Sequence, residues 1–290
     1  MTTLVTGATG TTGYAALQAL HEAGEPVRAM VRRPEQKTRF GSGIEVVVAD
    51  MTDPASLPAA LKGVEQMLLI SPLEQALPIL QTRMAAAAKS AGVVRIVKVS
   101  TEVADPESDD LIGRWHGQAE RAVEATDLAN FHVRPCNFMQ NLFSFAASIA
   151  QTGSFWAPMQ EARMSLIDAC DVGLAAAAAL RDRTLVQGHR VVTGADRPTY
   201  AEFAALVQAA IGRPVRYESV SPNEAKRRFL AAGMPGWKAD ALVHMYAYLQ
   251  DPATTPLTAG FTALTGRPPR RLDDFVVEHA RGFAEGTLRH

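Results

Sequence analysis

Three glycines at three-residue spacing close to the N-terminus constrain this chain more than any other feature. The sequence begins MTTLVTGATGTTG, so Gly7, Gly10 and Gly13 follow the apolar pair Leu4 and Val5 and precede a run of helix-forming residues. A buried strand, a glycine turn and a helix start are typical of the first unit of a dinucleotide-binding fold. An ordinary tight turn in an α/β domain is the alternative interpretation. The position of the motif favours nucleotide binding.

Each glycine has its own physical role in such a turn. Gly7 allows the backbone to leave the strand sharply, Gly10 removes a side chain where a pyrophosphate approaches the main chain, and Gly13 allows close packing of the helix on the strand. Free amide groups at the helix start, together with the helix dipole, favour bound phosphate. The cofactor-binding residues expected in this turn are Gly7, Thr9, Gly10, Thr11, Thr12 and Gly13.

The composition excludes several classes of protein. A chain of 290 residues with 47% apolar residues can bury a substantial core, and its net charge of -1 gives no electrostatic footprint for nucleic acid or an anionic membrane. No apolar run reaches about 18 residues, no signal peptide is evident, and Cys136 and Cys170 indicate free thiols. We therefore expect a cytoplasmic monomer or homodimer that binds neither nucleic acid, nor membrane, nor metal.

Strands and helices alternate through the first half of the chain. The expected strands are 27–31, 44–48, 64–70, 93–99 and 130–134, and the expected helices after them include 73–91 and 107–125. Such alternation requires parallel pairing with right-handed crossovers. The sequence therefore predicts an α/β fold with a Rossmann-type doubly wound parallel sheet.

The second strand ends at the position that contacts the adenosine ribose in this fold. Arg32 and Arg33 stand there, and a guanidinium suits the 2'-phosphate of NADP(H), whereas an acid would suit NAD(H). We expect Arg32 to select NADP(H), with NAD(H) as a second possibility, unless the two arginines merely solvate a strand end. Asp50 is expected to bind adenine or to cap a turn. Ser71 and Ser100 follow later strands and are expected at the cofactor.

The chain changes character after Pro135, where aromatic and methionine residues become frequent. We predict an NADP-binding domain over 1–136 and a smaller α/β substrate-binding region over 137–290, of which about 166–194 returns to the first domain. Further helices are expected at 199–212, 235–249 and 271–283. The aromatic segment either lines a substrate cleft or forms a core patch. The candidates for the cleft wall are Asn137, Phe138, Asn141, Phe143 and Trp156.

Several segments together resemble the NmrA-like group of atypical short-chain dehydrogenases/reductases. They are Thr6–Gly13, Val27–Pro34, Val48–Pro54, His116–Glu120, His132–Asn141, Arg163–Asp171 and Leu264–Pro269, and they span nearly the whole chain. The resemblance implies a Rossmann domain that binds NADP(H) and a small C-terminal substrate domain. Some members of this group reduce quinones, azo compounds, triphenylmethane dyes or aryl ethers. Others are regulators that bind the dinucleotide without turning it over.

The chain departs from the wider family in its catalytic residues. Short-chain dehydrogenases generally use Tyr-x-x-x-Lys, but none of the five tyrosines here is followed by a lysine four residues later. By resemblance, Ile112 stands at the tyrosine position and His116 at the lysine position. The spacing of His116 and Glu120 places them on one helix face, where Glu120 could orient the imidazole for binding the ribose or relaying a proton. A solvated surface pair is the alternative.

Without the tyrosine, reduction of a plain ketone is disfavoured. A quinone, an azo bond or a dye carbocation accepts hydride into an extended π-system and needs less help from a proton donor. We therefore expect an NADPH-dependent oxidoreductase that acts on an aromatic or quinone-like small molecule. The alternative is a non-catalytic NADP(H)-sensing regulator that acts through a protein partner, and a specialised biosynthetic enzyme is a third possibility.

Overall fold

The computed structural model describes residues 2–251 and 256–288. Their contacts divide into two compact units, which we call the sheet unit and the aromatic unit. The sheet unit comprises residues 1–135, 169–192 and 260–267, and the aromatic unit comprises residues 136–168, 193–259 and 268–290. Each unit is therefore assembled from three separate parts of the chain.

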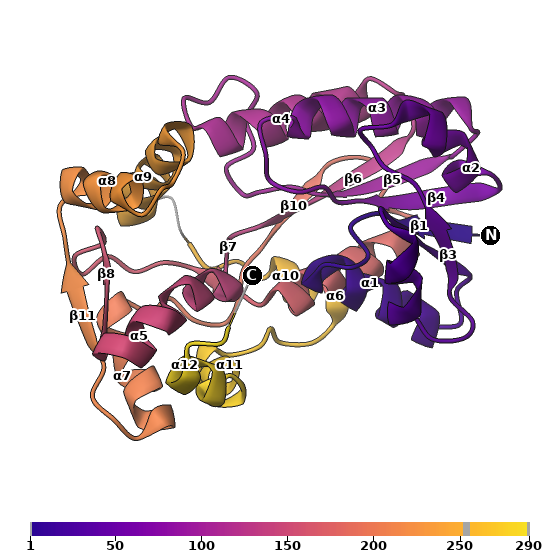
Figure 1. Cartoon of the computed structure of the whole chain (residues 1–290). Helices are drawn as coiled ribbons and strands as arrows, with labels where there is room; N and C mark the ends of the chain where they lie inside the picture. The colour runs from indigo at the N-terminus through magenta and orange to yellow at the C-terminus, as the bar shows by residue number, and fades with distance from the viewer. Residues whose placement is uncertain (1, 252–255, 289–290) are drawn as a thin grey trace. The chain divides into compact units, whose positions relative to one another are not determined.

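A seven-stranded sheet forms the centre of the sheet unit (Figure 1). Its strands are β1 (Thr2–Val5), β2 (Val27–Val31), β3 (Glu45–Val48), β4 (Val64–Leu69), β5 (Arg95–Val99), β6 (Ala129–Pro135) and β10 (His189–Val192). The order is β10-β6-β5-β4-β1-β2-β3, and every neighbouring pair is parallel. The Rossmann-type prediction is confirmed. The order reverses between β1 and β4, where this fold opens a crevice at the carboxyl ends of the strands.

Helices cover both faces of the sheet (Figure 1). α1 (Thr11–Glu22) packs beside α6 (Ala169–Arg181), and α3 (Leu77–Ser90) packs beside α4 (Leu111–Glu124) on the other face. The shorter elements are η1 (Pro34–Arg39), η2 (Pro54–Ser56), α2 (Leu57–Leu61) and α10 (Gly260–Thr265). α1 and α6 approach so closely that a Cβ on Gly173 would lie 2.4 Å from the carbonyl oxygen of Thr12.

Two helices begin later than the sequence predicts. α3 begins at Leu77 rather than residue 73, because Pro78 has no amide hydrogen and fits only the first turn, where none is needed. α4 begins at Leu111 rather than residue 107. Asp110 caps it, with one carboxylate oxygen accepting a 2.6 Å hydrogen bond from the amide of Gly113.

The aromatic unit holds two short parallel strand pairs, β8–β11 and β7–β9. Its elements are β7 (Asn137–Phe138), η3 (Met139–Phe145), α5 (Ala146–Thr152), β8 (Ser154–Ala157), β9 (Leu166–Ile167), α7 (Tyr200–Ile211), β11 (Arg216–Ser219), α8 (Pro222–Ala231), α9 (Gly236–Gln250), α11 (Leu272–Glu278) and α12 (Ala280–Glu285). The helix expected over 271–283 is therefore two helices, which meet at His279.

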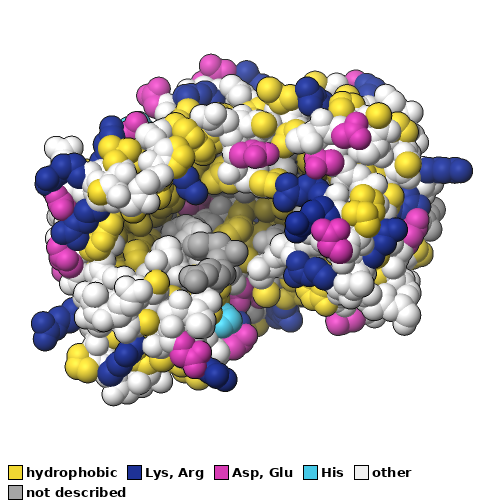
Figure 2. Space-filling model, viewed as in Figure 1, with side chains coloured by type: hydrophobic (Ala, Val, Ile, Leu, Met, Phe, Trp, Pro, Cys, Tyr) yellow, Lys and Arg dark blue, Asp and Glu magenta, His cyan; other side chains and the backbone are white. Residues whose placement is uncertain are grey.

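Aromatic rings fill the core of this unit. The Phe155 ring lies 5.8 Å from that of Tyr200 and 5.5 Å from that of Phe203, and Phe275 and Phe283 are also fully buried. On the face that Figure 2 shows, basic and acidic side chains are interspersed. None of the helices that the structure describes combines the length and apolarity needed to cross a membrane.

Candidate active site

The glycine turn after β1 has the geometry that its sequence predicts at Gly7 and Gly10. Gly7 adopts a φ of 61°, which favours glycine, and the only neighbouring atom near a Cβ built on Gly10 is the Gly7 carbonyl oxygen at 3.5 Å. A Cβ on Gly13 would lie 2.3 Å from that same oxygen. The close contact of Gly13 is therefore with the turn itself rather than with the strand, which corrects the predicted role.

The start of α1 is available to an anion. Gly10 is the N-cap with an extended backbone, and no side chain caps the helix. The amides of Thr11 and Thr12 therefore have no acceptor within the helix. A phosphate group would accept hydrogen bonds from them and would benefit from the helix dipole.

A buried threonine closes the floor of the crevice between β1 and β4. The Thr6 hydroxyl oxygen lies 2.7 Å from both the carbonyl oxygen and the amide nitrogen of Ile70, and its side chain is fully buried. The hydroxyl donates to the first and accepts from the second. This link fixes the ends of two neighbouring strands. Thr6 lies in the quoted glycine motif, but sequence reasoning did not assign it a role.

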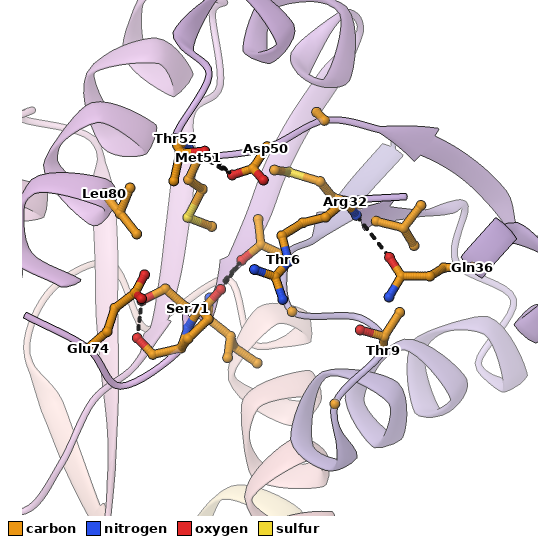
Figure 3. A pocket seen from close by; sticks show the side chains of 17 residues that line it. Thr6, Thr9, Arg32, Gln36, Asp50, Met51, Thr52, Ser71, Glu74 and Leu80 are labelled. Atoms are coloured by element: carbon orange, nitrogen blue, oxygen red, sulfur yellow. Dashed lines mark hydrogen bonds between the residues drawn. The ribbon is translucent and has the colours of Figure 1, made fainter. Parts of the chain in front are cut away.

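A cavity of about 280 Å³ lies at the carboxyl ends of β1, β2 and β4 (Figure 3). It brings together six of the residues predicted to bind the cofactor, namely Gly7, Thr9, Gly10, Arg32, Asp50 and Ser71. The predicted residues Thr11, Thr12, Gly13, Ser100 and His116 do not line it. The cavity therefore joins the glycine turn to the end of β2, where the adenosine half of a dinucleotide binds in this fold.

Arg32 is exposed, and its side chain extends into the cavity (Figure 3). The Gln36 side-chain oxygen accepts hydrogen bonds from the amides of Arg32 at 3.2 Å and Arg33 at 3.0 Å. The Arg33 guanidinium instead lies 3.3 Å from the Glu35 carboxylate. Gln36 thus holds the backbone that carries Arg32. The sequence carried a signal that we did not use, because Gln36 is the third residue of η1, a capping-box position that follows a proline.

Asp50 and Ser71 both have partners within the protein. One Asp50 carboxylate oxygen accepts hydrogen bonds of 2.8 Å from the amide and the hydroxyl of Thr52. The Ser71 hydroxyl accepts a 2.9 Å hydrogen bond from the side-chain nitrogen (Nε2) of Gln81. Asp50 therefore caps its turn, and since it also lines the cavity, both of the roles considered for it are compatible with the structure.

A lysine and a histidine form a hydrogen-bonded pair beside the end of β5. Lys98 is fully buried, and its Nζ lies 3.0 Å from Nδ1 of His116 on α4, whereas the Val99 carbonyl oxygen is a weaker partner at 3.4 Å. Burial lowers the pKa of Lys98 to about 7, and the nearby Glu120 carboxylate opposes this shift. Burial and the charge of Lys98 hold the pKa of His116 well below its usual range. His116 is therefore neutral at pH 7.

Glu120 has a different partner from the one predicted. Its two carboxylate oxygens bind the Arg134 guanidinium, one of them accepting from Nε at 3.0 Å. Burial opposes ionisation of Glu120, but the hydrogen bonds from Arg134 hold its pKa below the usual value. The prediction that Glu120 orients the imidazole is wrong, because Arg134 engages Glu120 and Lys98 engages His116. Nor is the pair solvated, because Glu120 is buried.

Two further polar residues follow β5. The pairing of this segment with β6 continues past the end of β5. The backbone amide of Ser100 donates to the Val133 carbonyl oxygen at 2.8 Å, and that of Glu102 donates to the Pro135 carbonyl oxygen at 3.0 Å. Ser100 is buried. Burial raises the pKa of Glu102 to about 7. Both side chains therefore lie at the carboxyl edge of the sheet, although sequence reasoning singled out only Ser100.

The residues predicted for a substrate wall all belong to the aromatic unit. The Phe143 ring stacks on Phe275 at 5.4 Å, as the core-patch alternative predicts. The Trp156 ring contacts Phe229 at 5.2 Å and the Arg228 guanidinium at 5.1 Å.

The remaining three wall residues lie at β7 and the start of η3. The Asn141 amide donates to the Asn137 side-chain oxygen, and Phe138 is partly exposed. The role of all five residues toward a substrate stays a prediction.

Comparison with known proteins adds three relatives. The model of the NmrA-like family matches residues 1–273. An NAD(P)H azoreductase of Xenophilus azovorans is 35% identical over 281 residues, 97% of this chain and 98% of its own. A (4-alkanoyl-5-oxo-2,5-dihydrofuran-3-yl)methyl phosphate reductase of Streptomyces griseus is 36% identical over 284 residues, which are 97% of this chain and 99% of the reductase. The crystal structure of an NADPH-dependent quinone oxidoreductase of Escherichia coli with NADPH superposes with a TM-score of 0.87 at 25% identity. The superposition covers 96% of this chain and 99% of the oxidoreductase.

Proposed function

Because the chain belongs to the NmrA-like family, we propose that it is an NADPH-dependent oxidoreductase that transfers hydride to a conjugated small molecule, such as a quinone or an azo compound. The relatives of 35% and 36% identity are reductases, so the chain is an oxidoreductase that uses NADP(H). The observation that carries the proposal is one cavity bounded by both the glycine turn and Arg32. We further propose that it acts in the cytoplasm as a monomer or a homodimer.

The sheet unit fits the cofactor in two places. The uncapped start of α1 and the bare Gly10 suit the pyrophosphate, and Arg32, held by Gln36, suits the 2'-phosphate. The bound cofactor supplies the hydride. In this proposal the protein positions the nicotinamide against a stacked acceptor and excludes water. The five residues of the aromatic unit predicted to contact the acceptor are proposed for that role, and Trp156 is the first of them to test.

The experiment is NADPH oxidation followed by absorbance with a panel of quinones, azo dyes and triphenylmethane dyes. NADPH binding is titrated on the same sample, so that a failure to bind is distinguished from a failure to react. Turnover with any member of the panel supports the proposal. Tight binding without turnover across the panel contradicts it.

The regulator remains the second candidate, because no tyrosine in the chain is followed by a lysine four residues later. In that case NADPH and NADP+ would bind with different affinities and alter capture of a protein partner. Titrating both forms of the dinucleotide separates the two candidates when the acceptor panel gives no turnover.

A further inference from the structure

A fully buried lysine in a central strand requires an explanation, because moving an ammonium group out of water is costly unless it is paired. Lys98 contacts His116 on α4, and the carboxylate of Glu120 on the same helix acts on its charge. Arg134 engages both oxygens of that carboxylate. Among the described residues, the acceptors within hydrogen-bonding distance of Nζ are Nδ1 of His116 and the Val99 carbonyl oxygen.

This contact determines which nitrogen of His116 carries hydrogen. An ammonium group can only donate, so whenever Lys98 is charged its partner Nδ1 is the unprotonated nitrogen of a neutral ring. The hydrogen must therefore be on Nε2. Because His116 as a whole residue is less buried than Lys98, Nε2 is the end of the pair at which we place the acceptor.

The pair also lies at the correct edge of the sheet. Lys98 is the last residue but one of β5, and β5 pairs in parallel with β4, whose end bounds the cofactor cavity. Ligands of this fold bind outside the carboxyl ends of the strands. α4 is held firmly there, since a Cβ on Gly113 would lie 2.5 Å from the Val103 carbonyl oxygen, and one on Gly117 would lie 2.2 Å from the nitrogen of Pro106.

We propose that Lys98 and His116 form a proton relay that protonates the acceptor after it has received hydride, in place of the absent tyrosine. This inference rests on the proposed function. His116 is then the catalytic acid. Lys98 is a positioning residue that orients the His116 ring and supplies it with a proton. The relay assigns to the chain a class of acceptor that needs one proton for each hydride, such as a quinone or an azo bond.

Reduction of a quinone consumes one hydride and one proton. Hydride brings two electrons and one hydrogen, which leaves a hydroquinone anion. His116 gives its Nε2 proton to this anion while Lys98 passes a proton to Nδ1, so the hydroquinone forms and Lys98 becomes a neutral amine. Nε2 then takes a proton from water, and the Nδ1 proton returns to Lys98. Burial favours this exchange, because it lowers the pKa of Lys98 to about 7.

The other charged groups around Lys98 come from α4 and β6. They are Glu120, Arg134 and His132, and the last of these is kept neutral by burial, which lowers its pKa to about 4. Glu120 and Arg134 compensate each other through their ion pair. The titration of the pair is therefore expected to depend on Lys98 and His116 themselves.

The test compares two acceptors on the complete protein. A quinone needs a proton after hydride transfer, whereas a triarylmethyl dye cation is neutralised by hydride alone. We expect Lys98→Met and His116→Phe to lower the ratio of quinone to dye turnover by at least about tenfold, in line with the usual contribution of a general acid. In the unaltered protein this ratio is expected to fall as the pH rises from about 6 to 9. In Lys98→Met it should be low at every pH.

Arg95→Met is the matched control. Arg95 is a buried cation on the same strand, but it donates to the Ala179 and Leu185 carbonyl oxygens and has no contact with His116. The ratio of quinone to dye turnover in Arg95→Met should match that of the unaltered protein, even if the stability of the variant falls. Equal losses on both acceptors in Lys98→Met, or no change in their ratio, would overturn the relay.

A second readout does not depend on turnover. Nitrogen NMR of the His116 ring in the protein without cofactor should show a neutral ring protonated at Nε2 at pH 6, where Lys98 is charged. In Lys98→Met the preference for that tautomer should be lost. A ring protonated at Nδ1 overturns the relay. Failure of the unaltered protein to reduce either acceptor would instead overturn the proposed function, and the NMR result would still test the pair.

Discussion

At the scale of single residues, the site divides into groups that an aligned motif reveals and groups that only folding brings together. Arg32 belongs to the first kind, because the end of the second strand is a fixed position in a dinucleotide fold. Lys98 belongs to the second kind. It stands in the buried strand Arg95–Val99, and its contact with His116 joins this strand to the next helix. A signal was available: a strand covered on both faces leaves no exposed side for a lysine.

Replacing Arg32 tests the cofactor preference. We expect Arg32→Ala to weaken NADPH binding by roughly 10- to 100-fold, since a hydrogen bond between charged groups contributes about 1.5–3 kcal/mol. NADH lacks the 2'-phosphate and should lose little affinity. Fluorescence titration with both dinucleotides measures the two changes. Equal losses would remove Arg32 from the 2'-phosphate, and Arg33→Ala is the control, since Arg33 pairs with Glu35 instead.

Replacing Lys98 tests the cost of its burial. The pKa of Lys98 is about 7 in the folded protein and 10.5 ordinarily, so the unfolded chain binds more protons between these values. The free energy of unfolding from this group therefore rises with pH across that window. We expect Lys98→Met to be more stable than the unaltered protein at pH 7, by an amount on the order of a few kcal/mol that shrinks toward pH 10. Urea unfolding at several pH values measures it, and a pH-independent difference would refute the assignment.

At the scale of elements, sequence reasoning succeeded where local chemistry is decisive. The strand Val27–Val31 has the predicted bounds, and the helix predicted over 199–212 is α7, which begins after a capping box of Thr199 and Glu202. Sequence reasoning failed where a tertiary contact determines whether an element forms or where it ends. The break at His279 divides the last predicted helix, and β8 was missed because its four residues pair with β11, some sixty residues later in the chain.

The glycine turn allows binding and folding to be separated. A Cβ at Gly10 would lie at ordinary contact distance from the Gly7 carbonyl oxygen, so Gly10→Val should lose NADPH binding while its free energy of unfolding changes by about 1 kcal/mol or less. Gly13→Ala should instead destabilise the protein by roughly 1–3 kcal/mol, because its Cβ would overlap the Gly7 carbonyl oxygen. Calorimetric titration and urea unfolding of both variants provide the comparison. Unchanged NADPH affinity in Gly10→Val would contradict the phosphate-binding role.

At the scale of the whole molecule, the sheet unit depends on residues far along the chain. α6 supplies buried residues to one face of the sheet, and β10 pairs with β6. Gly260, at the start of α10, approaches β10 so closely that a Cβ there would lie 1.9 Å from the Val191 carbonyl oxygen. The sequence predicted the return of about 166–194, but it offered no signal for the contribution of α10.

Truncation tests this dependence. A chain ending at residue 135 keeps six of the seven strands but loses α6, β10 and α10. We expect it to show no cooperative urea transition and no NADPH binding, because the face of the sheet that α1 and α6 cover together would lose α6 and expose apolar residues to water. The full chain is the control. Cooperative unfolding of the truncated chain would show that residues 1–135 form an independent domain.

The late position of β10 also matters while the protein is being synthesised. Residues 1–135 leave the ribosome well before residues 189–192 do, so for that interval the β6 segment lacks the strand that pairs with it on one side. Strand segments with unpaired backbone groups recruit strands from other chains. The nascent chain therefore needs protection from its neighbours over that interval, and slowing translation between residues 135 and 192 would increase aggregation of this protein more than an equal delay after residue 267.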